Sequence, residues 1–207
     1  MFSKQFAVTV VMATLASADA TLTKSKYPEV IPGPGLPSLT SLNLTSEQLY
    51  TMTPKLVSRG LSAALYDPEC REYPCYCPGG MAQVNDIIAC YNYLNNLGST
   101  NCGVMAYQAK STMCASGTAK VDAMNNSPNL ELPVIVRCAD AAAGVQYVYQ
   151  TCNNNGQARG SAAAWGNGYL IVRSQNVNYD GWCMPTVSAM QKRARRKNKK
   201  SKSISKS

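Results

Sequence analysis

Two segments of the chain carry apolar residues at helical spacing. Residues 81–97 place one apolar series on a single helix face: Val84, Ile87, Ile88, Tyr91, Leu94 and Leu97. Residues 139–151 do the same with Ala141, Val145, Val148 and the following Cys152. Spacings of three and four residues are typical of a helix with one buried face. We therefore expect two amphipathic helices, the first followed by Gly98 as a left-handed cap.

Alternating patterns predict the strands. Residues 118–124 alternate apolar and polar side chains as a half-buried strand does. The apolar side of this strand comprises Ala119, Val121 and Ala123, and the polar side comprises Lys120 and Asp122. Residues 103–108 form a second, shorter candidate. Residues 134–136 are apolar and β-branched, which fits either a strand end or the lead into the second helix.

A hairpin is predicted after the second helix. Residues 159–165 and 169–173 flank Gly166-Asn167-Gly168, and Asn-Gly supplies the positive φ angles of a tight turn. The first of these strands is rich in glycine and alanine, which indicates close packing under a helix. The second begins with four residues that are apolar on both faces, so we expect a central strand. The order helix, strands, helix, strands predicts an α+β fold with two helices on a small antiparallel sheet.

The chain has nine cysteines and no histidine. The cysteines are Cys70, Cys75, Cys77, Cys90, Cys102, Cys114, Cys138, Cys152 and Cys183. Cys138 and Cys152 lie about four helical turns apart, so both face one way and would staple the second helix to a sheet at both ends. The odd count predicts up to four disulfides and one leftover thiol. A metal site is not expected, because Cys75-Tyr76-Cys77 is too tight for a zinc knuckle and no second pair exists.

Composition divides the chain into four zones. Residues 1–20 have the pattern of a secretory signal peptide, with Lys4, an apolar run over residues 6–15 and cleavage after Ala20, or alternatively after Ala18. A membrane anchor is the competing interpretation, but the run is half the length of a spanning helix. Residues 21–60 are rich in proline and are expected to lack regular structure, apart from a short helical turn capped by Ser46. We expect a disulfide-rich folded domain over residues 61–185.

Residues 186–207 form a basic tail. The net charge of +9 comes from this tail, because basic and acidic residues cancel in the rest of the chain. Its cluster comprises Lys192, Arg193, Arg195, Arg196, Lys197, Lys199 and Lys200. Three interpretations are open: a disordered solvated extension, a segment that binds polyanions such as lipid, polysaccharide or nucleic acid, or a nuclear-import signal. Its dibasic sites also permit removal by a protease of the secretory pathway.

The candidate chemistry argues against catalysis. Without histidine, serine or cysteine triads and histidine acid–base catalysis are excluded. The acidic residues of the predicted domain are Asp67, Glu69, Glu72, Asp86, Asp122, Glu131, Asp140 and Asp180, and they form no recognisable pair. Asp86 and Asp140 fall on the polar faces of the two helices, where solvated acids are common. We expect no cofactor. Asn43 and Asn125 begin glycosylation sequons, the second weakened by Pro128.

Two stretches give the chain a family resemblance. Residues 138–152, CADAAAGVQYVYQTC, and residues 160–172, GSAAAWGNGYLIV, are similar to small secreted cysteine-rich proteins of filamentous ascomycete fungi. The proline-rich residues 27–37 and the segment 41–46 resemble the lead segment of the same group. The resemblance implies an effector with a sandwich similar to killer toxins or necrosis-inducing effectors. It also implies that five cysteines are bridged framework positions, namely Cys90, Cys102, Cys114, Cys138 and Cys152, and that the other four are additions.

These observations favour a secreted, non-enzymatic effector or toxin-like protein that binds a protein, glycan or membrane target outside the cell. Two other hypotheses stay open. One is a small secreted hydrolase that uses carboxylates, which would need two acids close together in a cleft. The other is a cell-surface or cell-wall protein held by its basic tail.

Overall fold

A six-stranded antiparallel sheet is the centre of the molecule. The computed structural model describes residues 25–55, 68–70, 75–76, 79–166, 168–179 and 184–185. Within these, the strand order is β1-β6-β7-β12-β11-β2. The strands are β1 (Val30–Pro32), β6 (Lys110–Ser116), β7 (Ala119–Asn125), β12 (Leu170–Asn176), β11 (Gly160–Ala163) and β2 (Glu69–Cys70). The predicted hairpin is present as β11 and β12, and β12 lies centrally with Leu170, Ile171 and Val172 buried.

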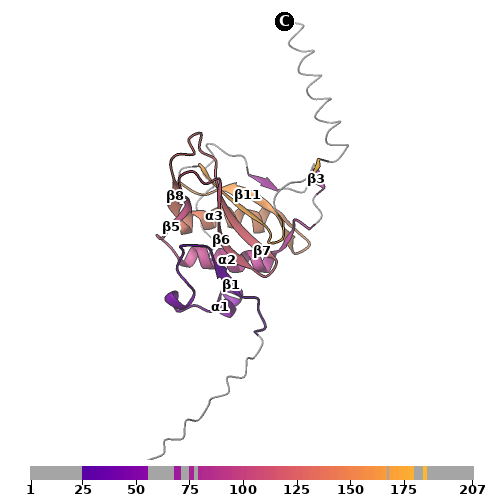
Figure 1. Cartoon of the computed structure of the whole chain (residues 1–207). Helices are drawn as coiled ribbons and strands as arrows, with labels where there is room; N and C mark the ends of the chain where they lie inside the picture. Colours follow the sequence, from indigo (N-terminus) through magenta and orange to yellow (C-terminus); the bar gives the residue numbers. More distant parts are fainter. Residues whose placement is uncertain are drawn as a thin grey trace, which may run out of the picture.

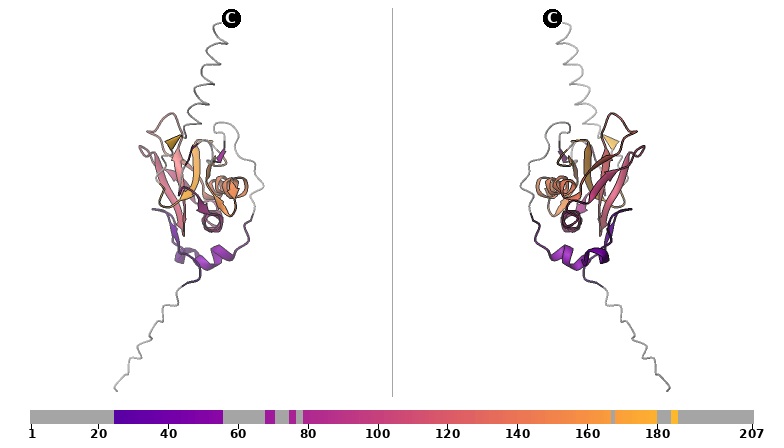
Figure 2. Two further views of the ribbon diagram at one scale, coloured as in Figure 1. Left: turned by 90° about the vertical axis from the view of Figure 1, so that its right-hand side faces the viewer. Right: turned by 90° about the vertical axis from the view of Figure 1, so that its left-hand side faces the viewer.

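Two helices cover one face of this sheet. They are α2 (Val84–Asn96) and α3 (Cys138–Thr151), and Figures 1 and 2 show them side by side in a layer against the strands. Close packing of α3 on β11 has a visible cause: a β-carbon at Gly144 would lie 3.0 Å from the Val172 side chain and 3.3 Å from the Ala162 carbonyl oxygen. The α+β class predicted from the sequence is confirmed.

Three disulfides tie the helices to the strands. Cys90 of α2 is bonded to Cys114 of β6. Cys138 and Cys152, at the two ends of α3, are bonded to Cys102 of β5 and Cys70 of β2. The helix is therefore stapled at both ends, as its spacing predicted. Cys70, which the resemblance implies to be an addition to the five framework cysteines, is the partner of Cys152.

The described residues also form three smaller sheets. The strands β5 (Asn101–Val104) and β8 (Val134–Arg137) pair with each other. A three-stranded sheet consists of β4 (Ala82–Gln83), β10 (Gln157–Ala158) and β9 (Asn153–Asn154), and β13 (Met184–Pro185) pairs with β3 (Cys75–Tyr76). Residues 134–136 are thus a strand. Of the predicted strand 103–108, only the first two residues belong to β5, because the chain turns at Met105.

The sequence pattern did not predict β6. Its alternation is broken by an irregularity between Thr112 and Cys114, where an extra residue, Met113, enters the strand. Met113 and Cys114 are consecutive and both buried, whereas a regular strand would expose one of them. The bulge therefore hides the period of two on which a strand prediction depends.

Residues 25–55, here called the strap, are folded onto this body, contrary to the expectation of an irregular lead segment. They contain β1, the 3-10 turn η1 (Thr40–Leu42) and α1 (Ser46–Thr51). The predicted helical turn is present, but Thr45 caps it: its hydroxyl accepts from Gln48 N–H, and the Gln48 side chain accepts from Thr45 N–H. The Ser46 hydroxyl instead accepts from Val30 N–H at 2.9 Å. The expected boundary of the folded domain at residue 61 is therefore too late.

The strap is held by polar groups of α2. The Asn92 amide donates to the carbonyl oxygens of Leu49 and Met52 at 2.8 and 3.1 Å. The Tyr93 hydroxyl donates to the Pro37 carbonyl at 2.7 Å. Leu49 itself is fully buried. Because the strap and α3 lie on opposite sides of α2 and the sheet covers a third side, most residues of this helix are buried (Figure 2).

Candidate functional site

Asp86 is buried under the strap, which corrects the prediction of a solvated helix acid. One carboxylate oxygen accepts from the Tyr50 hydroxyl at 2.7 Å. The other accepts from the backbone N–H and the hydroxyl of Thr118, each at 2.7 Å. Thr118 lies in the turn between β6 and β7. Burial raises the pKa of the Tyr50 hydroxyl above its ordinary value. Asp86 therefore joins the strap, α2 and a hairpin turn.

Asp122 and Asp140 are also buried, in two other places. Asp122 lies on the face of the sheet opposite the helices, where it accepts from the Thr112 hydroxyl at 2.7 Å and from the Gln175 amide at 3.3 Å. Asp140 pairs with Arg137 one turn earlier, at 2.7 and 3.2 Å, and this pairing raises the pKa of the guanidinium. Each acid serves its own local network, so the three do not form a catalytic pair.

Metal ligands are not gathered in the described ranges. There, no group of three or more cysteine, aspartate or glutamate side chains is placed to hold an ion. Six cysteines are in disulfides, which leaves their sulfurs without nucleophilic character. No helix in the same ranges is long and apolar enough to cross a membrane.

Four of the six large apolar residues that are exposed in the described ranges lie on two neighbouring loops, and the other two are Ile31 of β1 and Val177 after β12. One loop joins β5 to β6 and the other joins β7 to β8, so both run between the same two sheets. The backbone N–H of Tyr107 donates to the Leu130 carbonyl at 2.7 Å, which holds the loops together. They expose 60% of Met105, 79% of Tyr107, 49% of Leu130 and 59% of Leu132. We call these four residues the loop-end surface.

Tyr107 has a left-handed backbone, with φ of 62°. For a bulky side chain this conformation is a genuine outlier that the surrounding structure must enforce. The hydrogen bond to Leu130, and the one from Gln108 N–H to the Met105 carbonyl at 3.2 Å, enforce it here. Because most of the Tyr107 side chain is exposed, packing of the ring does not compensate for this strain. Such strain is typical of binding sites.

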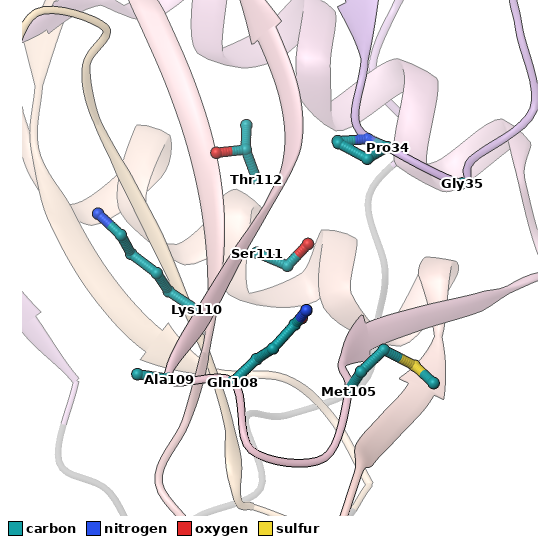
Figure 3. A pocket seen from close by; sticks show the side chains of 8 residues that line it. All are labelled: Pro34, Gly35, Met105, Gln108, Ala109, Lys110, Ser111 and Thr112. Atoms are coloured by element: carbon teal, nitrogen blue, oxygen red, sulfur yellow. The ribbon is translucent and has the colours of Figure 1, made fainter.

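A shallow groove lies beside the loop-end surface. It has a volume of about 720 Å³ and runs from Pro34 and Gly35 of the strap along β6 to Gln108 and Met105. Figure 3 shows the side chains of Met105, Gln108 and Ser111 directed toward this space, whereas Lys110 and Thr112 lie on the other side of β6. A second hollow of about 420 Å³ shares five of its lining residues and continues over Gly103 and Ile135.

The two predicted glycosylation sequons differ in their surroundings. The Asn125 amide group is engaged on both sides: its nitrogen donates to the Leu132 carbonyl at 3.4 Å, and its oxygen accepts from Ser127 N–H at 2.8 Å. Asn43 lies in an exposed turn between η1 and α1. Its geometry suits a glycan better than that of Asn125.

Several predicted residues lie outside the described ranges. These are the leader, the basic tail from Lys192 to Lys200, Cys77, Cys183, Asp67, Glu72 and Asp180. No sequence signal pointed to the loop-end surface, because its four apolar residues follow no period. An exposed left-handed tyrosine has no signature in a single sequence either.

A comparison with protein-family models gives one result. The model described as "Domain of unknown function (DUF8794)" matches residues 70–176, just over half of the chain. The chain belongs to this family. The DUF8794 region begins at Cys70 and contains the three disulfides seen among the described residues, both large helices and the loop-end surface. It leaves the strap outside. No curated protein and no solved structure matches the chain.

Proposed function

We propose that this DUF8794 protein is exported and acts outside the cell by binding a target without chemically changing it. The observation that carries the proposal is the loop-end surface: four exposed apolar side chains on two loops that are bonded to each other. Apolar side chains grouped on the surface mark interaction sites more often than scattered ones do. The rigid body beneath would keep the loops ordered before binding, which lowers the entropy cost of association.

Two observations support export: the leader pattern and the disulfides. Residues 1–20 resemble a signal peptide. The three disulfides are compatible with an extracellular location, because cytosolic thiols are kept reduced.

Binding rather than catalysis is supported by the places of the buried acids. Asp86, Asp122 and Asp140 are each hydrogen-bonded within the protein, and none of them lines the groove. Lys110 is the one charged residue in the groove lining. Together with the resemblance to secreted fungal proteins, this favours an effector or toxin-like role.

The test compares biological response with turnover. Purified, oxidised protein is infiltrated into host tissue and added to competing microbes, and damage or growth arrest is scored against dose. Reduced and alkylated protein from the same batch is the matched control. The same preparation is assayed for hydrolysis of RNA, glycan and peptide. We expect a dose-dependent response from the oxidised form and no enzyme-like rate. Hydrolysis at such a rate would establish the carboxylate alternative instead.

A further inference from the structure

The strap covers only part of one edge of the main sheet. β1 pairs with β6 at three positions, from Val30 opposite Ser116 to Pro32 opposite Cys114. The pairing ends with a hydrogen bond from Gly33 N–H to the Met113 carbonyl at 2.8 Å. Beyond it, Lys110, Ser111 and Thr112 of β6 pair with β7 on one side and line the groove on the other.

The register shows which backbone groups face the groove. Asn125 N–H donates to the Ala109 carbonyl at 3.0 Å, so residues 109 and 111 of this ladder exchange hydrogen bonds with β7. In an antiparallel pair the intervening residues direct their N–H and C=O groups away from the partner. Lys110 and Thr112 therefore point these groups toward the side on which β1 would have continued.

Gly33 explains why β1 stops there. A β-carbon at Gly33 would lie 2.0 Å from the Thr112 carbonyl oxygen, so the backbone of the strap crosses directly over that group. It then turns away through Pro34 and Gly35, which has φ of 79°. The N–H and C=O of Lys110 and the N–H of Thr112 remain along the groove. An edge that already receives one strand thus continues, without a strand, toward the loop-end surface.

The geometry points to this edge as a site where an extended segment of a target protein adds as a strand, continuing the line of β1. This inference rests on the proposed function, since it names the partner of the same surface. Only another extended backbone offers donors and acceptors at the spacing of a strand edge. The residue opposite Ser111 would direct its side chain toward Met105, which favours an apolar side chain at that position. Further contacts at Tyr107 would follow at the loop end.

The test uses short linear peptides selected from a random displayed library against the full-length oxidised protein. Affinities of the synthetic peptides are measured by fluorescence anisotropy. Lys110→Pro removes an N–H that β7 does not use, and proline is tolerated at such edge positions. Lys110→Ala is the matched control, because it removes the charge and keeps the N–H. We expect Lys110→Pro to weaken binding by roughly tenfold and Lys110→Ala to leave it nearly unchanged.

A second measurement guards against misfolding of the proline variant. N-methylation of the peptide at alternate residues should abolish binding, and methylation at the residues between them should not. Ser111→Phe, which fills the groove and keeps the backbone, should also weaken binding. The strand site would be overturned if the peptides bound equally well to the wild type, to Lys110→Pro and to Ser111→Phe, or if the library yielded no enriched peptide. Self-association that Lys110→Pro abolishes would instead place a second copy of this chain on the edge. Peptides lost with Tyr107→Ser but not with Lys110→Pro would leave the proposed function standing and reject the edge.

Discussion

The disulfide-tied body and the loop-end surface follow opposite rules. In the body, Cys90 and Leu94 are fully buried, and Asp86 accepts three hydrogen bonds, from Tyr50 of the strap and from Thr118. At the loop end, Tyr107 exposes most of its side chain and has a backbone conformation that other residues must enforce. Changes in the body should therefore cost stability, whereas changes at the loop end should cost binding and leave stability intact.

The largest loss is expected from the bridge between Cys70 and Cys152. These residues are 82 positions apart, so the bridge restricts a long segment of the unfolded chain. Replacing both with alanine should lower the free energy of unfolding by about 4 kcal/mol. The Cys90–Cys114 bridge spans 24 positions and should contribute less. Denaturant unfolding of the two double variants gives the ranking, and an unchanged midpoint for both would break the comparison.

Removal of a buried strap residue should come next. Leu49→Ala leaves a cavity between the strap and α2 and should cost about 3 kcal/mol. Glu47→Ala, on the exposed side of the same short helix, is the control and should change stability little. If the two variants melt together, the strap is not part of the cooperative unit.

Asp86→Asn tests whether this acid is structural. The amide keeps the shape of the side chain and loses the charge and one acceptor. The cost should be about 2 kcal/mol, since hydrogen bonds to charged groups contribute more than neutral ones. A variant that keeps its stability and loses a biological response would instead give Asp86 a functional role.

Alkaline pH should loosen the strap. Burial raises the pKa of Tyr93 to about 12 from 10.0 in the unfolded chain. Because the folded pKa is the higher one, this stabilisation is complete below pH 10 and is lost as the pH rises toward 12. Unfolding measured across this range should show a shallower decline for Tyr93→Phe than for the wild type. Burial also raises the pKa of Tyr50 and Tyr149, so some decline should persist in the variant.

The smallest expected effect has the opposite sign. Tyr107→Gly relieves a left-handed backbone and should raise stability by about 0.5 kcal/mol, after the entropy cost of glycine is subtracted. The same change at Tyr147, which lies inside α3 and packs partly against the core, should lower it by about 2 kcal/mol, through lost helix propensity and lost burial. Thermal melts of the pair sharpen the comparison, and a loss at Tyr107 equal to that at Tyr147 would contradict it.

The body could be predicted from the sequence to a larger extent than the loop-end surface could. Helices α2 and α3, the strand β7 and the β11–β12 hairpin have periods that a single chain displays. The bulge at Met113 hid β6, and most of the strap was missed because its short elements depend on contacts with distant parts of the chain, β1 with β6 and the rest with α2. Asp86 was placed in solvent because nothing local shows that a distant segment covers it. The loop-end surface consists of exposed residues without a period, so only the folded structure brings them together.

The central claim is that the loop-end surface binds the target and the body only supports it. The most direct test compares the double variant Tyr107→Ser, Leu132→Ser with Val177→Ser in the tissue and microbial response assay. Val177 is 38% exposed, and its N–H bonds to Thr118 at the opposite end of the sheet. The wild type, the double variant and Val177→Ser should have free energies of unfolding within about 0.5 kcal/mol of one another, because surface substitutions change stability little. The account predicts a response lost with the double variant and kept with Val177→Ser. A full response from the double variant would contradict it.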